Sequence, residues 1–293
     1  MYDIGRLYRA KDVDDALRAL AEDPESMLIS GGTDVLIRVR EGKAAGASLV
    51  SIHELPELTG VRLEADGSIV IGACTSFAHI AADPIIQELV PYLGEAVDQV
   101  GGPQTREAGT IGGNLCNGAT SADSAPMLLA LNAELTLQSA AGKRVVPATA
   151  FHTGPGRTVR NRDEILTEIR IFPADFQGFG GQYIKYGKRA AMEIATLGCA
   201  ALVKPAADRR TVASLRLAYG VAAPTPIRCA EAEALACGEA LTDTLLDEIA
   251  RTAAVHASPR SSWRASREFR LQLITELAGR AIRSAWTRAG GVF

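Results

Sequence analysis

The sequence is poor in the residue patterns that build metal centres and disulfide frameworks. Its 293 residues include five cysteines and four histidines. No two cysteines form a CxxC pair, and the histidines have neither HExxH nor HxxxH spacing, so the sequence predicts no metal site. The odd, scattered cysteines also argue against disulfides and indicate free thiols in a reducing cytoplasm. The GxSxG motif of hydrolases is missing too.

Neither sign of charge is in excess, and no long apolar run is present. The 31 basic and 34 acidic side chains give a net charge of −3, which argues against a nucleic-acid surface. The longest uncharged stretch, AGTIGGNLCNGATSA at residues 108–122, is too short and too polar to span a bilayer. The first ten residues lack the apolar core of a secretory signal. We therefore expect a cytoplasmic protein that binds neither nucleic acid nor membrane.

Apolar periodicity predicts helices mixed with short strands. Asp12 begins an amphipathic helix that ends before Pro24, and a buried strand over 27–30 stops at two glycines. Thr33 is then expected to cap a short helix, while Ser124 begins a helix through Leu131. Turns at Asp66-Gly67 and Gly142-Lys143 predict two β-hairpins.

A domain boundary is expected where periodicity is lost. Residues 172–181 combine a proline with a glycine cluster, a composition typical of a connection. Beyond this segment, 183–186, 197–203 and 215–219 are strand candidates, and two helices follow, the first capped by Thr242. Strands and helices in this order indicate an α+β protein without the regular alternation of a Rossmann fold.

The first segment that indicates binding is the turn after the strand that starts at Met27. Gly31-Gly32 stands where the strand ends and a helix is expected to begin. Such a turn offers open backbone amides and a helix N-terminus to a phosphate, and glycine lets the phosphate approach the backbone. A tight strand-to-helix turn without ligand would use two glycines equally well.

The second segment is Gly109-Thr110-Ile111-Gly112-Gly113-Asn114, inside the uncharged stretch. Its glycines do not have the GxGxxG spacing of a Rossmann fold, and the segment is not a GxxxxGK[ST] P-loop. Asp123 follows it and could accept hydrogen bonds from a ribose, although it could also be only a helix-start carboxylate. Two separated glycine turns favour a dinucleotide such as FAD, which is long enough to contact both.

Several motifs together resemble the FAD-binding medium subunits of molybdenum hydroxylases, the family of xanthine dehydrogenase and carbon monoxide dehydrogenase. The motifs cover nearly the whole chain: Ser30-Gly31-Gly32-Thr33-Asp34, Gly102-Pro103-Gln104-Thr105-Arg106, Thr110-Ile111-Gly112-Gly113-Asn114, Asp163-Glu164-Ile165-Leu166, Tyr183-Ile184-Lys185-Tyr186, Ala223-Pro224-Thr225-Pro226-Ile227-Arg228 and the segment from Arg264 to Arg270. Each is weak alone, but the combination is specific. Residues 114–123 and 151–156 are most similar to the forms in bacterial xanthine dehydrogenases.

The resemblance implies a set of cofactor-binding residues. Those implied to hold the FAD pyrophosphate are Met27, Leu28, Ile29, Ser30, Gly31, Gly32, Thr33 and Asp34 on one side, and Thr110, Ile111, Gly112, Gly113 and Asn114 on the other. Asp123 would hold the adenosine ribose, Leu166 would pack near the flavin, and Val100 stands where relatives place an aromatic residue. Lys185 would approach the flavin ring, where a cation favours the anionic reduced form; a solvent-facing lysine is the alternative.

The resemblance also implies the fold and the domains. It predicts an FAD-binding domain of the vanillyl-alcohol-oxidase-like (PCMH) type over residues 1–176, made of two α+β subdomains that divide near 55–60. A smaller C-terminal domain of the carbon monoxide dehydrogenase flavoprotein type, with an antiparallel sheet and helices, would cover 177–293.

The implied function is electron transfer within a heteromeric complex, which its motifs place in the xanthine dehydrogenase type. FAD would take electrons from [2Fe–2S] centres of an iron–sulfur subunit, and a subunit with the molybdenum cofactor would hydroxylate a purine. Reduced FAD would pass a hydride to NAD⁺, with no catalytic residue on this chain beyond the flavin. Two alternatives stay open: the FAD subunit of carbon monoxide dehydrogenase or another molybdenum hydroxylase, and a cofactor-free scaffold or assembly protein.

Overall fold

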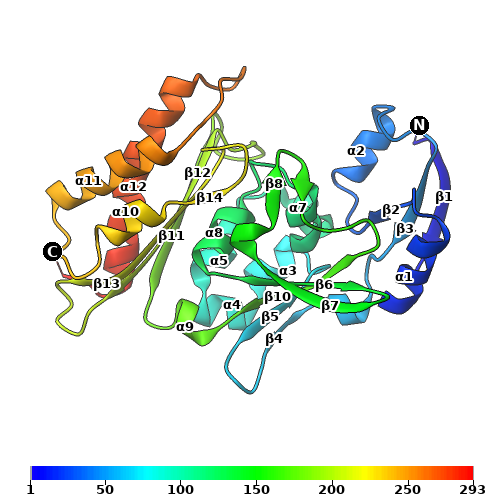
Figure 1. Cartoon of the computed structure of the whole chain (residues 1–293), viewed down its shortest axis with the longest axis horizontal. Coiled ribbons are helices and arrows are strands. Elements are labelled where there is room, and N and C mark those ends of the chain that lie inside the picture. Colours follow the sequence, from blue (N-terminus) through cyan, green and yellow to red (C-terminus); the bar gives the residue numbers. More distant parts are fainter. Residues whose placement is uncertain (1, 293) are drawn as a thin grey trace.

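The computed structural model describes residues 2–292, which form three lobes in a row along the longest axis (Figure 1). The first lobe is a three-stranded parallel sheet in the order β1-β3-β2. Helix α1 packs on this sheet and α2 follows β2. The elements are β1 (Ile4–Arg9), α1 (Val13–Glu22), β2 (Met27–Ile29), α2 (Val35–Arg40) and β3 (Ala47–Ser51).

The second lobe is a five-stranded antiparallel sheet in the order β4-β5-β10-β6-β7, with short helices packed on it. Its strands are β4 (Val61–Leu63), β5 (Ile69–Gly72), β6 (Glu134–Ser139), β7 (Gly142–Pro147) and β10 (Ile165–Ile171), and a small hairpin adds β8 (His152–Gly154) and β9 (Arg157–Thr158). Its helices are η1 (Pro56–Leu58), α3 (Phe77–Ala82), α4 (Pro84–Leu89), α5 (Pro91–Val97), α6 (Pro103–Ala108), α7 (Ile111–Asn117), α8 (Ser124–Ala130) and η2 (Ala148–Ala150).

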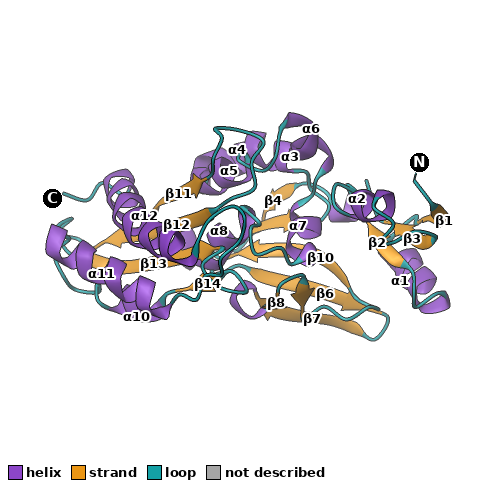
Figure 2. Ribbon diagram, turned by 90° about the horizontal axis from the view of Figure 1, so that it is seen from above, coloured by secondary structure: helices purple, strands orange, loops and turns teal. Residues whose placement is uncertain are grey.

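The third lobe is a four-stranded antiparallel sheet in the order β11-β12-β13-β14. Helix α12 packs against β11 and β12, and α8 packs against β12 and β13; Figure 2 shows α11 and α12 on the side of this sheet away from the second lobe. The elements are α9 (Pro173–Phe176), β11 (Gly180–Tyr186), β12 (Leu197–Pro205), β13 (Val212–Gly220), β14 (Ile227–Arg228), α10 (Ala230–Ala234), α11 (Asp243–His256) and α12 (Arg267–Arg288).

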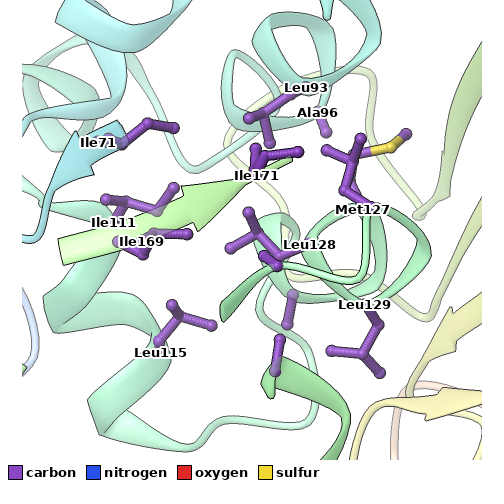
Figure 3. Close-up of a cluster of buried hydrophobic side chains, with 14 of the residues drawn as sticks. Ile71, Leu93, Ala96, Ile111, Leu115, Met127, Leu128, Leu129, Ile169 and Ile171 are labelled. Atoms are coloured by element: carbon purple, nitrogen blue, oxygen red, sulfur yellow. The ribbon is translucent and has the colours of Figure 1, made fainter. Parts of the chain in front are cut away.

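Three apolar cores hold the lobes together, and the central one, which extends onto the facing side of the third-lobe sheet, fixes the helix that follows the second glycine turn. Ile111 and Leu115 of α7 point toward Ile169 of β10, next to Leu128 of α8 (Figure 3). All four side chains are fully buried. Because buried apolar contact stabilises this arrangement, the N-terminus of α7 is held rigidly at the edge of the second lobe.

Most local predictions are confirmed. Asp12 Oδ1 accepts a hydrogen bond from the Asp15 amide at 2.7 Å and caps α1. The Asp66-Gly67 turn joins β4 and β5, with Gly67 at φ +80°. The three strand candidates of the third lobe are β11, β12 and β13, and Thr242 caps α11. The predicted α+β class is also confirmed.

Three details of the sequence interpretation are wrong. The cap of α2 is Asp34, not Thr33, and no side-chain hydrogen bond closes it. The second hairpin turns at residues 140–141, so that Gly142 already begins β7. The Ser124 hydroxyl does not cap α8 but donates to Asn114 Oδ1 at 2.7 Å. For Ser124, a hydrogen bond to a residue on α7 replaces the expected local cap.

Candidate cofactor site

A cavity of about 520 Å³ lies between the first and second lobes, a size within the usual range for cofactor sites. The first lobe lines it from Leu20 to Arg38, on the strand–turn–helix unit of β2 and α2. The second lobe lines it with the end of β5, the segments around α6 and α7, and the start of β10. Figure 1 shows β2 and α2 on the side of the first lobe that faces α7.

The two glycine turns meet at this cavity. A Cβ added to Gly31 would lie 1.6 Å from the carbonyl oxygen of Ala108 and 3.1 Å from Cα of Gly109. Only glycine permits that approach, because any side chain would push the backbones of the two lobes apart. Gly32 has φ +72°, a left-handed conformation that other residues rarely adopt. These two glycines therefore shape the floor of the cavity.

The first turn presents open hydrogen-bond donors. Among the described residues, the backbone amides of Gly31, Gly32, Thr33 and Asp34 have no acceptor. The Ser30 hydroxyl is buried and also lacks a partner. Buried polar groups are normally hydrogen-bonded, and an unpaired one indicates a ligand or water. Four open amides beside an unpaired hydroxyl fit the oxygens of a phosphate.

The second turn contributes differently. Thr110 Oγ1 accepts from the Gly113 amide at 3.2 Å and caps α7, and the Ile111 and Gly112 amides donate to Thr75 and Ala73 carbonyls at 3.1 and 2.8 Å. The Asn114 amide is also bonded within the helix. Because these amides are occupied, the turn contributes wall surface and the side chains of Thr110 and Asn114 to the cavity.

The structure brings most of the predicted cofactor-binding residues to one cavity. Those that line it are Met27, Leu28, Ser30, Gly31, Gly32, Thr33, Asp34, Val100, Thr110, Gly112, Gly113, Asn114 and Leu166. Ile29 and Ile111 are buried in the apolar cores instead, with 8% and 0% exposure. Burial raises the pKa of the Asp34 carboxyl, and the nearby Arg38 partly opposes that rise.

Asp123 and Lys185 lie outside the cavity lining and bind each other. Lys185 Nζ is 2.8 Å from Asp123 Oδ2, and the Tyr183 hydroxyl donates to Asp123 Oδ1 at 2.8 Å. Burial raises the pKa of the Asp123 carboxyl, and Lys185 offsets part of the rise. Lys185 also donates to the Gln99 carbonyl at 2.8 Å. Lys185 thereby ties the backbone next to Val100 to β11 of the third lobe.

Sequence reasoning missed the residues of the cavity that come from loop 160–162. Arg160 and Arg162 both line it, and Arg162 forms an ion pair of 2.7 Å with Glu25 on the opposite lobe. Arg160 Nη1 donates to the Asn161 and Glu164 carbonyls at 2.9 and 2.8 Å. The two arginines just before a strand are the only indication in the sequence, because only the folded structure shows that Glu25 lies across the cavity from Arg162.

Within residues 2–292 there is no group of three or more histidine, cysteine or acidic side chains that could hold a metal ion. Over the same residues, none of the helices combines the length and apolar character that a membrane span requires.

Comparisons with known proteins agree with this geometry. Residues 2–174 match the FAD binding domain in molybdopterin dehydrogenase, and residues 182–285 match the carbon monoxide dehydrogenase flavoprotein C-terminal domain. The xanthine dehydrogenase FAD-binding subunit of Escherichia coli O157:H7 is 44% identical over 99% of both chains. The carbon monoxide dehydrogenase medium chain of Hydrogenophaga pseudoflava is 32% identical over 95% of this chain and 96% of that one.

Solved structures give the same result. A chain of carbon monoxide dehydrogenase from Hydrogenophaga pseudoflava superimposes with a TM-score of 0.93 at 30% identity, covering 98% of this chain and 99% of that one. The fold and the interlobe cavity define an FAD-binding domain of the PCMH type with a flavoprotein C-terminal domain. The chain belongs to the family of FAD-binding medium subunits of molybdenum hydroxylases. It is thus an oxidoreductase subunit, as the sequence motifs predict.

Proposed function

We propose that the interlobe cavity holds FAD, with the pyrophosphate on the first glycine turn. The observation that carries this proposal is the group of four open amides, Gly31 to Asp34, beside the unpaired Ser30 hydroxyl. Bound FAD supplies electron and hydride transfer chemistry that no side chain can provide. The chain itself binds and orients the cofactor and excludes water from it.

Roles for the remaining residues follow from their positions in the cavity. Val100 and Leu166 are two of the apolar side chains that line it on the second lobe, together with Ala73, Phe77 and Ile165. We assign Val100 and Leu166 to the faces of the flavin ring. Lys185, which pairs with Asp123, donates to the Gln99 carbonyl next to Val100. We therefore propose that the two residues position the ring-binding segment. The family resemblance implies in addition that Asp123 contacts the ribose and Lys185 the flavin ring.

The domain division is proposed on the same basis. The FAD-binding domain covers 1–176 and the C-terminal domain 177–293. The two subdomains divide near 55–60, because β3 ends at Ser51 and η1 begins at Pro56 on the second lobe. All five cysteines are free, which supports the cytoplasmic location expected from the sequence.

The complex is proposed to be a xanthine dehydrogenase type. The support is the 44% identity to a chain described as a xanthine dehydrogenase FAD-binding subunit, against 32% to a carbon monoxide dehydrogenase medium chain. Partner chains would carry the [2Fe–2S] centres and the molybdenum cofactor, and NAD⁺ would accept the electrons. Reconstitution of the three chains tests this: purine-dependent NAD⁺ reduction is expected, and carbon monoxide-dependent activity instead would favour the alternative.

Flavin binding is tested with Gly32→Ala. Gly32 and Gly46 have almost the same φ, +72° and +71°, so an added Cβ strains both backbones equally. At Gly32 the Cβ would crowd Leu36 Cδ1 at 3.1 Å and Ile29 Cδ1 at 3.3 Å and so distort the turn that carries the open amides, whereas at Gly46 it meets nothing within 4 Å. We expect Gly32→Ala to lose flavin absorption and Gly46→Ala to retain it. Equal flavin content in the two variants would show that the first glycine turn is not part of the flavin site.

Gly112 is a poor choice for this test. A Cβ there would lie 2.6 Å from the Ala73 carbonyl oxygen. Substitution would therefore disturb the packing of α7 on the second lobe, and loss of flavin could follow from misfolding alone.

A further inference from the structure

The loop between α11 and α12 projects from the third lobe and carries an exposed tryptophan. Trp263 is 76% exposed, and the loop forms the tip at the top of that lobe in Figure 1. The segment after β11 adds Met192 and Ile194, with 64% and 50% exposure. Tyr186 packs edge-on against Phe269 and joins the two segments. We call residues 186–194 and 260–269 together the Trp263 surface.

The Trp263 surface has a concentration of unpaired positive charge. Residues 260–270 contain four arginines and one acidic residue, Glu268. Among the described residues, no carboxylate pairs with any of these arginines or with Lys188; the only acidic partner on this surface is Glu193, which pairs with Arg189. Arginines elsewhere, such as Arg62, Arg144 and Arg228, do pair with glutamates. The cations on this surface without an ion pair are Lys188, Arg260, Arg264 and Arg267, whereas Arg270 also lacks a carboxylate but is buried.

The projecting loop is held in one conformation from inside. Arg270, only 2% exposed, donates to the Thr196 carbonyl at 3.1 Å, to Ser262 Oγ at 2.9 Å and to the Arg260 carbonyl. The Ser262 amide donates to the Ala265 carbonyl at 2.9 Å and closes the turn around Trp263. A fixed loop loses little conformational entropy on binding, so its exposed tryptophan is ready to bind.

Two cations flank the Trp263 ring. The Arg264 guanidinium lies 4.3 Å from the ring centroid and Lys188 Nζ 5.3 Å from it. Arg264 Nε is buried without a hydrogen-bond partner. Tryptophan and arginine are the residues most enriched at the energetic centres of protein interfaces. The cations around this aromatic residue favour a partner that presents carboxylates.

We infer that the Trp263 surface is a docking site for a partner chain that presents carboxylates around an apolar pocket for Trp263. This inference rests on the proposed function, in which the chain works beside iron–sulfur and molybdenum subunits. The surface also borders the cofactor cavity. Met192 of this surface lies against Gly102, since a Cβ on Gly102 would be 3.1 Å from Met192 Cγ, and Val100, two residues before Gly102, lines the cavity. A chain docked here therefore contacts the segment next to the proposed flavin.

The test measures assembly of the full-length chain with the purified iron–sulfur and molybdenum chains. Trp263→Ala and Arg264→Glu/Arg267→Glu are expected to raise the dissociation constant at least tenfold, as loss of a central contact does. Added salt is expected to weaken wild-type assembly. Matched controls are Val145→Ala, an apolar residue 55% exposed on β7, and Lys143→Glu/Arg210→Glu, two exposed cations whose side chains form no ion pair in the described structure.

Each outcome decides the inference. Variants that assemble like wild type would overturn it. It would also be overturned if assembly is unchanged and only the wild-type chain, not the variants, binds vesicles that contain phosphatidylserine. Flavin content and thermal unfolding are measured on every variant and are expected to match wild type. Missing flavin in the wild-type chain would contradict the proposed function, whereas normal flavin with unchanged assembly would contradict only the docking site.

Discussion

Gly31 and Ala108, 77 positions apart in the sequence, are in backbone contact: a Cβ on Gly31 would lie 1.6 Å from the Ala108 carbonyl oxygen. This contact closes the cavity floor where the two glycine turns meet. It joins the parallel sheet of the first lobe to the segment that leads into α7. The cavity exists in this form only because Gly31 carries no side chain where it meets the Ala108 carbonyl.

Gly31→Ala is therefore expected to separate the lobes locally. Overpacking of this kind costs about 1 to 3 kcal/mol in unfolding free energy. We expect a lower thermal midpoint together with weaker flavin binding. Differential scanning calorimetry and flavin fluorescence measure the two effects, with Gly46→Ala as the control. A variant with wild-type midpoint and wild-type affinity would show that the contact is looser than described.

Glu25 and Arg162 form an ion pair between the lobes at the cavity, and this pair is expected to slow cofactor release. The side chains are 85% and 74% exposed, and exposed pairs contribute little, so the effect should be about two- to fivefold on the release rate. Glu25→Arg and Arg162→Glu should each speed FAD release, and the double exchange should restore it. Stopped-flow flavin fluorescence checks this cycle.

The exposed Glu276–Arg280 pair on α12 is the control for that cycle. Its charge exchange should leave FAD release unchanged. If the double exchange of Glu25 and Arg162 does not restore the rate, the ion pair does not hold the lobes together.

Glu164 links stability to pH. Its carboxylate accepts from Arg144 Nη2 at 2.8 Å and from the Asn161 amide at 2.7 Å. The hydrogen bond from Arg144 is the main cause that lowers the pKa of Glu164 below its ordinary value of 4.5. Because this pKa is lower in the folded chain than in the unfolded chain, ionised Glu164 stabilises the fold fully at pH values above the unfolded-state pKa. That stability is lost as the pH falls below about 4.5 and passes through the folded-state pKa.

Glu164→Gln should therefore reduce the loss of stability on acidification. Urea unfolding between about pH 7 and pH 3 measures it, since the slope with pH reports the difference in bound protons. A variant with the same slope as wild type over this range would show that other carboxylates carry the acid sensitivity.

Asp123 and Lys185 form a buried pair, and removing one member should cost more than removing both. Their side chains are 6% and 9% exposed, so Lys185→Met leaves the Asp123 carboxylate unpaired at a cost of about 3 to 5 kcal/mol. Asp123→Asn/Lys185→Met should recover much of that free energy of unfolding. The double variant should still bind flavin more weakly, because the Gln99 carbonyl loses its donor. Unfolding and flavin titration separate the two effects.

Local chemistry explains what the sequence predicted well. The Asp12 cap, the Asp66-Gly67 hairpin and the Thr242 cap depend on neighbours within a few residues. The glycine turns are likewise visible as short motifs. Where two local partners compete, as Thr33 and Asp34 do before α2, the sequence does not show which one occupies the cap position.

Short patterns and their order along the chain suffice to predict the element types, the two glycine turns and the family. The tertiary structure alone decided that Gly31 meets Ala108, that Asp123 binds Lys185 rather than facing the cavity, and that Arg162 reaches Glu25. It also decided that Trp263 is exposed among unpaired cations. The physical reason is that these contacts join residues far apart in the chain, so they form only when the lobes pack against each other.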